Sequence, residues 1–153
     1  MSIAYTQAKL SDILAMQALV LPEVKSGVIL FRSDDEIANN IRSYVLAKDG
    51  NTVVGFAALH IHAPDLAEVR SLIVHSDYRG KSIGKDLVLY TVKEANELGI
   101  KQLFTLTYQK AFFEKLAFVE IPKESLPEHK IWADCVKCKH FPICDEIALI
   151  ITP

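Results

Sequence analysis

The sequence lacks any apolar run long enough to cross a membrane and any strong excess of one charge. A membrane-spanning helix needs roughly 18 consecutive apolar residues, and every apolar stretch here is shorter. The formal net charge is −2, which argues against a general nucleic-acid surface. Residues 1–5 lack the basic region that, followed by a long apolar segment, marks a signal peptide. We therefore expect a cytoplasmic protein that acts on a small molecule and has no nucleic-acid or membrane partner.

Cysteine is scarce as well, with three residues that all lie late in the chain. An odd, clustered set does not suit a disulfide framework. The fold must then depend on a hydrophobic core, and 153 residues of which 50% are hydrophobic are enough for one. We found no internal repeat, low-complexity tract or linker. We expect a single domain over residues 1–153, with a Cys-containing insertion at about 123–146.

Apolar periodicity predicts strands and helices in alternation, and therefore an α/β or α+β fold with a mixed sheet flanked by about four helices. The predicted strands are Ile3–Gln7, Tyr44–Lys48, Thr52–Ile61, Leu66–Val74, Gln102–Thr107, Phe118–Ile121 and Ile147–Ile151. Asp49-Gly50-Asn51 predicts a hairpin turn. The predicted helices are one from Ile13 that ends at Pro22, one after the capping box Ser33–Glu36, one over Ile83–Leu98 and one over Lys110–Leu116. Val24–Phe31 suits either a loop or a short strand.

The stretch Leu72–Lys85 joins a predicted strand to the longest predicted helix through a basic, glycine-containing loop. Backbone N–H groups are free at a helix start, and the helix dipole adds about half a positive charge. Arg79, Lys81 and Lys85 add full charges. These features predict a phosphate-binding site, although a plain strand–turn–helix connection would also account for them.

This loop and the order of elements resemble the GCN5-related N-acetyltransferase (GNAT) superfamily. The acetyl-CoA loop of that superfamily has the pattern Arg/Gln-x-x-Gly-x-Gly/Ala, and Arg79, Ser82 and Gly84 occupy its three positions. Ser82 replaces the first glycine, which argues against a positive φ there, because only glycine adopts one without steric cost. Ala117-Phe118 stands where the superfamily usually has Gly-Phe. The resemblance implies a central sheet that is mostly antiparallel.

Three further blocks are similar to the short bacterial N-acetylglutamate synthases. They are Ala67–Leu72, the pair Leu106–Gln109 and Phe112–Leu116, and scattered residues from Leu126 to Glu146. The resemblance implies an enzyme that transfers acetyl from acetyl-CoA to the α-amino group of an amino acid, L-glutamate first, in arginine biosynthesis. It also implies a set of coenzyme contacts. Ile73 and Val74 would pair with the pantetheine arm, and the pyrophosphate would lie on Arg79, Gly80, Lys81, Ser82, Ile83 and Gly84.

An arginine in an apolar strand needs an anion, either a structural carboxylate or a ligand. The resemblance to the synthases implies that Arg70 and Ser71 bind a carboxylate of glutamate. Strict alternation places Glu68 and Arg70 on one face of the strand and Ser71 on the other, so both ligands reach one substrate only if the strand bulges. Arg32 is a second carboxylate candidate. The structural alternatives are an Arg70–Glu68 or Arg70–loop pair and a solvated Arg32.

Acetyl transfer requires the ammonium group of the acceptor to lose a proton. Glu68 is the best-placed base, directly or through water, unless it only pairs with Arg70. The superfamily often has a tyrosine that protonates the leaving thiolate, but Phe112-Phe113 occupies the matching place. Tyr108 is our candidate for this proton donor. The alternative is that Tyr108 is an aromatic residue at the edge of the sheet without a catalytic role. A thiol of pKa near 8.5 can also leave without such an acid.

The late block Cys135-x-x-Cys138-x-His140-x-x-x-Cys144 offers four ligands that would suit tetrahedral zinc. A redox pair, or buried thiols that pack with Trp132 and Phe141, would account for the same residues. Two other functions stay open. The first is GNAT transfer to another amine, such as a polyamine or a protein N-terminus. The second is a non-catalytic module that binds acetyl-CoA or zinc, which the serine at 82 and the missing tyrosine would suit. The sequence also leaves a homodimer open.

Overall fold

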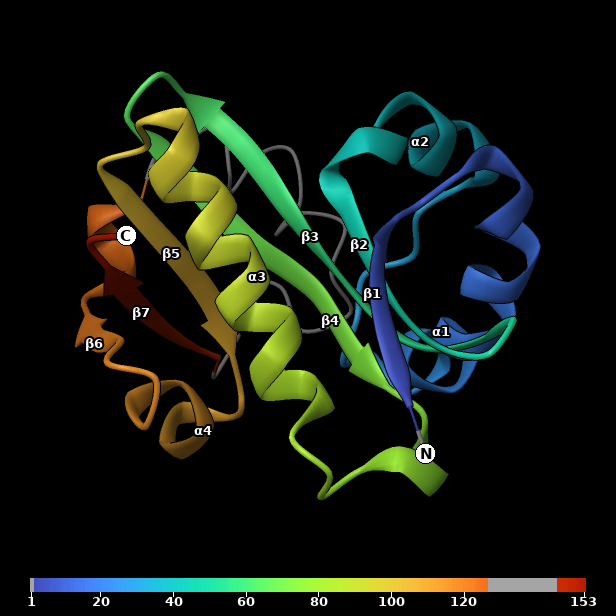
Figure 1. Ribbon diagram of the computed structural model, residues 1–153. Coiled ribbons are helices and arrows are strands. Elements are labelled where there is room, and N and C mark those ends of the chain that lie inside the picture. Colours follow the sequence, from blue (N-terminus) through green and yellow to red (C-terminus); the bar gives the residue numbers. More distant parts are fainter. Residues whose placement is uncertain (1, 127–145) are drawn as a thin grey trace.

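Seven strands and four α-helices, with short 3₁₀ turns, make up the residues that the computed structural model describes, 2–126 and 146–153 (Figure 1). The strands are β1 (Ile3–Gln7), β2 (Tyr44–Asp49), β3 (Thr52–Ala63), β4 (Leu66–Val74), β5 (Gln102–Thr107), β6 (Val119–Ile121) and β7 (Ile147–Ile151). The helices are α1 (Ile13–Lys25), α2 (Asp34–Asn39), α3 (Ile83–Leu98) and α4 (Lys110–Glu114). No helix among the described residues is long and apolar enough to span a bilayer.

The strands form one sheet in the order β1-β2-β3-β4-β5-β7-β6. Every neighbouring pair is antiparallel except β4 and β5, which are parallel and are connected by α3. A parallel pair needs a crossover of this kind, whereas hairpins join antiparallel neighbours. The predicted mixed, mostly antiparallel sheet with four helices is confirmed.

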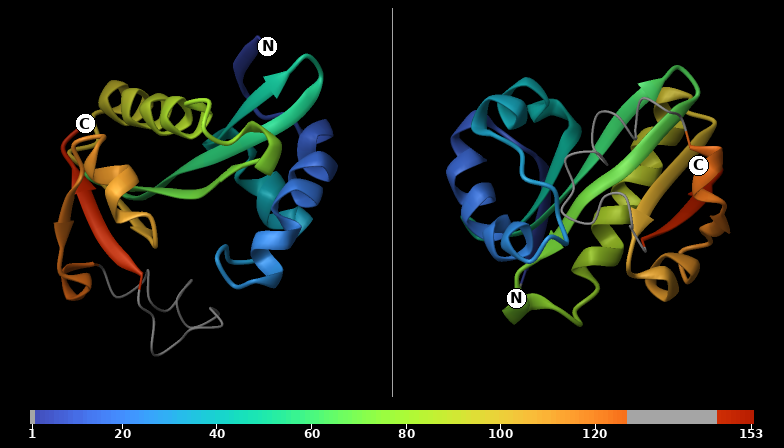
Figure 2. Two further views of the ribbon diagram at one scale, coloured as in Figure 1. Left: turned by 90° about the horizontal axis from the view of Figure 1, so that it is seen from below. Right: turned by 180° about the vertical axis from the view of Figure 1, so that it is seen from behind.

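The helices cover both faces of the sheet (Figure 2). α3 packs on one face, where its buried Leu87, Val88 and Ala95 join apolar side chains of β2, β3 and β4. α1 and α2 pack on the other face, where Met16, Val20 and Ile37 meet Tyr44, Phe56 and Ile73. Phe113 of α4 belongs to the cluster on the α3 side. The apolar stripes on the helices and the alternating strand residues thus meet as the sequence pattern predicts.

The predicted end of α1 at Pro22 is wrong, because this helix continues to Lys25 with the proline inside it. Proline removes its own N–H and crowds the carbonyl four residues earlier, although its φ suits a helix. Its carbonyl still accepts a bond from Ser26 N at 3.1 Å, and the carbonyl that loses a donor belongs to the exposed Ala18. Residues 26–33 then form a loop rather than a strand. α4 is two residues shorter than predicted and ends at Glu114.

Candidate functional site

β4 and β5 pair over only three residues and then diverge. Their ladder runs from Leu66–Gln102 to Glu68–Phe104, and Figure 1 shows the two strands separating towards their C-terminal ends. One residue past the last pair, the buried Thr105 donates its hydroxyl to the carbonyl oxygen of Val69 at 3.0 Å. We call this opening, bounded by residues 69–74 of β4 and 105–107 of β5, the fork. It leaves an inner strand edge beside the predicted pantetheine residues Ile73 and Val74.

β4 bulges where the sequence analysis required it to. Against β3, Phe56 lies opposite Ile73 and Ala58 opposite Arg70, so β4 carries one extra residue in this interval. Ser71 takes a left-handed backbone, with φ of 60°. The extra residue changes which side chains point to the α1 side: Ile73, after the bulge, packs in the cluster with α1, and the charge of Arg70, before the bulge, acts on Tyr44 of that cluster.

A pocket of about 190 Å³ opens at the fork. Three predicted site residues of β4 line it together with Arg32 and Tyr108. The full lining is Gly27, Val28, Ile29, Leu30, Arg32, Glu68, Val69, Arg70, Ser71, Leu72, Thr105, Leu106, Thr107, Tyr108, Gln109, Phe113 and Glu146. Residues far apart in sequence, from the loop after α1, from β4 and from β5, therefore meet in one cavity of the size of a small molecule.

Two arginines bring positive charge to this pocket. Arg32 and Arg70 both line it, and the Arg32 side chain is 13% exposed and lies 3.7 Å from the carboxylate of Glu36. Tyr44 lies close to both guanidinium groups. Burial raises the pKa of the Tyr44 hydroxyl, and the charges of Arg32 and Arg70 oppose that rise. Two guanidinium groups beside one cavity form a site that can bind carboxylates.

Glu68 lies at the last β4–β5 pair and is almost fully buried. Its carboxylate Oε1 is 2.9 Å from Nε2 of His62, and both side chains are at most 4% exposed. The His62 ring stacks on Phe104, with centroids 5.5 Å apart, and meets the edge of His60 at 4.7 Å. The structure thus gives Glu68 a histidine partner, which the sequence analysis did not predict.

Tyr108 follows β5 and lines the same pocket, with 36% of its surface exposed. The turn that carries it is held by Thr107, whose hydroxyl accepts from the backbone N of Gln109 at 2.9 Å. Phe112 and Phe113, in the place where the superfamily often has a tyrosine, pack with each other at 5.0 Å. Tyr108 is therefore the phenol at this end of β5 that reaches the cavity.

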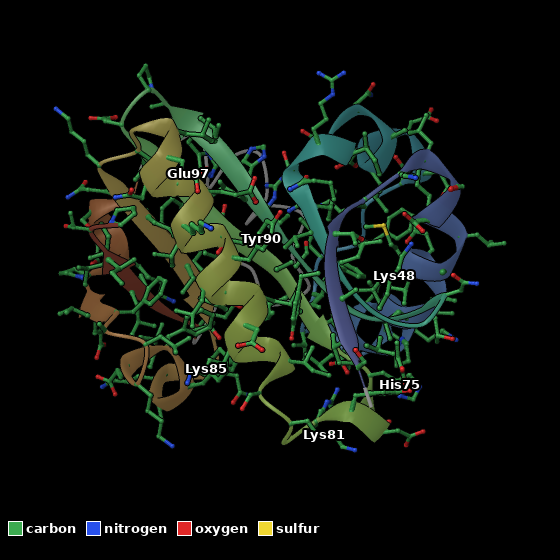
Figure 3. All side chains as sticks on the ribbon, in the orientation of Figure 1. Lys48, His75, Lys81, Lys85, Tyr90 and Glu97 are labelled. Carbon is green, nitrogen blue, oxygen red and sulfur yellow. The ribbon has the colours of Figure 1, made fainter. Side chains whose placement is uncertain are left out.

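The predicted coenzyme loop runs from β4 to the first turn of α3. Gly80 and Ser82 both have positive φ, of 77° and 66°. The sequence argued against this conformation at Ser82, and that interpretation is wrong, because the serine takes a left-handed backbone. Lys81 lies on the loop and Lys85 on the first turn of the helix (Figure 3). The first N–H groups of α3 can bind an anion here.

Arg79, the first residue of the motif, ties the loop to two other elements. Its Nε donates to the carbonyl of Val74 at 3.1 Å, and its Nη2 lies 3.3 Å from a carboxylate oxygen of Glu23 in α1. The carbonyl of Glu23 accepts from the backbone of Val28 and Ile29, which line the pocket. Glu23 therefore links the loop to the pocket wall.

The predicted zinc ligands Cys135, Cys138, His140 and Cys144 lie outside the described residues. Within residues 2–126 and 146–153, no group of three His, Cys, Asp or Glu side chains is arranged to hold a metal ion.

The sequence does not reveal the His62–Glu68 pair. A regular turn at Pro64-Asp65 would place Ile61 opposite Glu68, whereas the structure pairs His60 with Glu68 because the register shifts between Ile61 and Ala63. The link between Arg79 and Glu23 is equally hidden, because these residues lie 56 positions apart in the chain with no shared pattern.

Comparison with known proteins identifies the family. Residues 14–118 match the model of the acetyltransferase (GNAT) family. An uncharacterized N-acetyltransferase of Chlorobaculum tepidum is 36% identical over 145 residues, which cover 95% of this chain and 93% of the relative. An amino-acid acetyltransferase of Buchnera aphidicola is 31% identical over 147 residues, or 94% of this chain. The chain spans only 32% of the length of that enzyme.

Among solved structures, the N-acetylglutamate synthase from Neisseria gonorrhoeae, complexed with coenzyme A and N-acetyl-glutamate, superposes with a TM-score of 0.88. The match covers 99% of this chain and 35% of that one, at 23% sequence identity. At this identity the likeness concerns the fold.

Proposed function

The chain belongs to the acetyltransferase (GNAT) family and is an acetyl-CoA-dependent N-acetyltransferase, and on that premise we propose that its acceptor is the α-amino group of L-glutamate. The observation that carries this proposal is the convergence of Arg32, Arg70 and Ser71 on one pocket at the fork. Glutamate has two carboxylates, and each guanidinium offers paired donors to one of them. The amino-acid acetyltransferase and N-acetylglutamate synthase names among the similar proteins support the same acceptor.

Acetyl-CoA fits the groups at the other end of the fork. The loop Arg79–Gly84 presents backbone N–H groups and the positive end of a helix of 16 residues, next to Lys81 and Lys85. The edge of β4 beyond Glu68 has no β5 partner in the ladder, so an extended arm can lie along Ile73 and Val74, where Arg79 Nε now donates to the Val74 carbonyl. When bound, acetyl-CoA supplies an activated acyl group as a thioester.

The residues of this chain would then divide the work by position. Arg32, Arg70 and Ser71 orient the acceptor by its carboxylates. Glu68 receives a proton from the ammonium group, directly or through water, and so exposes the nitrogen lone pair. Tyr108 stands at the end of β5 as a hydroxyl donor for the leaving sulfur. Holding two reactants in one cavity supplies much of the rate enhancement in such a transfer.

A panel of acceptors tests the proposal. Purified protein is mixed with acetyl-CoA and with L-glutamate, L-glutamine, L-aspartate, L-alanine or spermidine, while free thiol and the acetylated product are both followed. We expect L-glutamate to have the highest kcat/KM. A kcat/KM for spermidine above that of every amino acid would contradict the choice of acceptor. If thiol were released with none of the amines, catalysis at this pocket would be contradicted.

Arg70 gives the same proposal a second test. Removal of the guanidinium in Arg70→Ala should raise the KM for glutamate by about 10²-fold, because one charged hydrogen-bonded contact is lost. The KM for acetyl-CoA should stay within about twofold. Arg42→Ala is the matched control, since Arg42 is exposed and does not line the pocket. Equal glutamate KM values in both variants would contradict the role of Arg70.

A further inference from the structure

Glu68 is a buried carboxylate in the proposed site, and its state of protonation depends on the groups around it. A buried carboxylate without charge-stabilising contacts is driven towards its neutral form, because burial penalises the ionised one. A neutral carboxylic acid cannot accept a proton from an ammonium group. If Glu68 is the base, the fold has to supply a group that keeps it ionised at neutral pH.

We propose that His62 is the positioning residue that keeps Glu68 ionised and fixes its orientation toward the acceptor amine. This inference rests on the proposed acetyl transfer at the fork. His62 Nε2 lies 2.9 Å from Glu68 Oε1, and the two side chains are 4% and 3% exposed. When the carboxylate is ionised it has no hydrogen to give, so in this proposal the imidazole Nε2–H donates to it.

The His62 ring is itself held in place from two sides. Phe104 stacks on it at an interplanar angle of 28°, and His60 meets it edge-on at 80°. Phe104 is also the strand partner of Glu68 in the last pair before the fork. The ring, its stacking partner and the carboxylate therefore occupy the same face of three adjacent strands. This arrangement fixes the direction of the Nε2–H bond and with it the plane of the carboxylate.

Other charged and titratable groups face Glu68 from the surrounding elements. His60 comes from β3 and Arg70 from β4, on the same face. Arg32, Tyr108 and Glu146 line the same pocket from the loop before α2, the end of β5 and the residue before β7. Their combined field affects the carboxylate in every variant alike, so a change made only at His62 isolates the contribution of the imidazole.

Two substitutions at position 62 separate the hydrogen bond from mere packing. His62→Leu fills similar space without a donor, and His62→Gln retains an N–H at the end of its side chain. In the leucine variant the pKa of the Glu68 carboxyl should rise, and the acidic limb of the kcat/KM profile should move up by about 1 pH unit or more. At the foot of that limb, kcat/KM should fall by about tenfold. The glutamine variant should keep the limb close to that of the unaltered protein.

The readouts are the pH profile of kcat/KM, with whichever amine is the best acceptor in the panel, and ¹³C NMR titration of the Glu68 side-chain carboxyl. The titration does not require turnover, so it tests the pair even if glutamate proves to be the wrong acceptor. A higher carboxyl pKa in His62→Leu with recovery in His62→Gln supports the inference. The same carboxyl pKa in all three proteins overturns it. Should the leucine variant fail to fold, the glutamine variant and His62→Asn replace it, because Asn has a shorter reach and should lose the contact.

Discussion

The Thr105 hydroxyl and the Val69 carbonyl form a hydrogen bond of 3.0 Å between β5 and β4, one step beyond their last backbone pair. Both residues are almost fully buried. A side chain thus continues the connection between two strands at the point where their backbones begin to separate. It also satisfies a carbonyl that the divergence would otherwise leave without a strand partner on this side.

Removal of this hydroxyl should destabilise the fold. Thr105→Val has nearly the same shape but leaves the Val69 carbonyl buried without its donor. We expect the free energy of unfolding to fall by about 1–2 kcal/mol, measured by urea denaturation. Thr105→Ser retains the hydroxyl and loses only a methyl group, so it should cost less. A valine variant as stable as the unaltered protein would show that the hydrogen bond contributes nothing net.

Replacement of Ser82 by glycine should stabilise the fold. Its φ of 66° is left-handed, and its side chain makes no capping bond. Ser82→Gly should relieve the steric strain and raise the free energy of unfolding by about 0.5–1 kcal/mol, less the entropy that glycine adds to the unfolded chain. Ser11→Gly, at an exposed position without positive φ, is the control and should lower stability. The same thermal-unfolding series would include Ala117→Gly, since Ala117 has a φ of 73°.

Tyr108→Phe tests the proposed donor to the leaving sulfur. We expect kcat to fall by about 10²-fold, the lower end of general acid catalysis, because a thiolate is already a good leaving group. The glutamate KM should change little. Tyr90→Phe makes the same chemical change on α3, away from the pocket, and should leave kcat unchanged. Equal kcat values for the two variants would assign Tyr108 to the pocket wall alone.

The hydrogen bond between Tyr5 and Asp86 should contribute stability that is lost at alkaline pH. The Tyr5 hydroxyl donates to Asp86 Oδ2 at 3.0 Å, and burial, with this bond, raises the pKa of Tyr5 to about 12. A raised pKa means that the contribution is complete below the tyrosine's unfolded pKa of about 10 and is lost as pH rises through the folded value. Tyr5→Phe should therefore be less stable by about 1 kcal/mol near neutral pH. The difference should shrink above pH 10 in urea denaturation, and a difference that stays constant to pH 11.5 would contradict this account.

The fold was largely predictable from the sequence because turn-forming residues flank segments that have a clear apolar pattern. β4 and β5 have the predicted bounds, since apolar runs stop there at polar turns. α1 continues past Pro22 because the packing of Val20 and Val24 in the apolar cluster on this face outweighs the hydrogen bond that the proline removes. Local sequence is a weak guide when tertiary burial opposes it.

The site was predictable only in part, for a different reason. The resemblance to a family implied roles for Arg70 and Ser71 and with them a bulge in the strand, and Glu68 followed from its position beside Arg70, but no pattern in the sequence shows a left-handed Ser71. Contacts between distant segments, such as Arg79 with Glu23, depend on where side chains end in space. Such pairs follow from the assembled fold rather than from spacing along the chain.

The fork also decides what holds the two arms of the sheet together. β1 to β4 form one arm and β5, β7 and β6 the other, and three backbone pairs join them. The larger link is the apolar cluster in which Val88 and Ala95 of α3 meet Val69 on one arm and Leu149 on the other. Apolar association weakens on cooling, so the junction between the arms depends on an interaction that cold reduces. The width of the fork therefore depends on how tightly α3 stays packed across both arms.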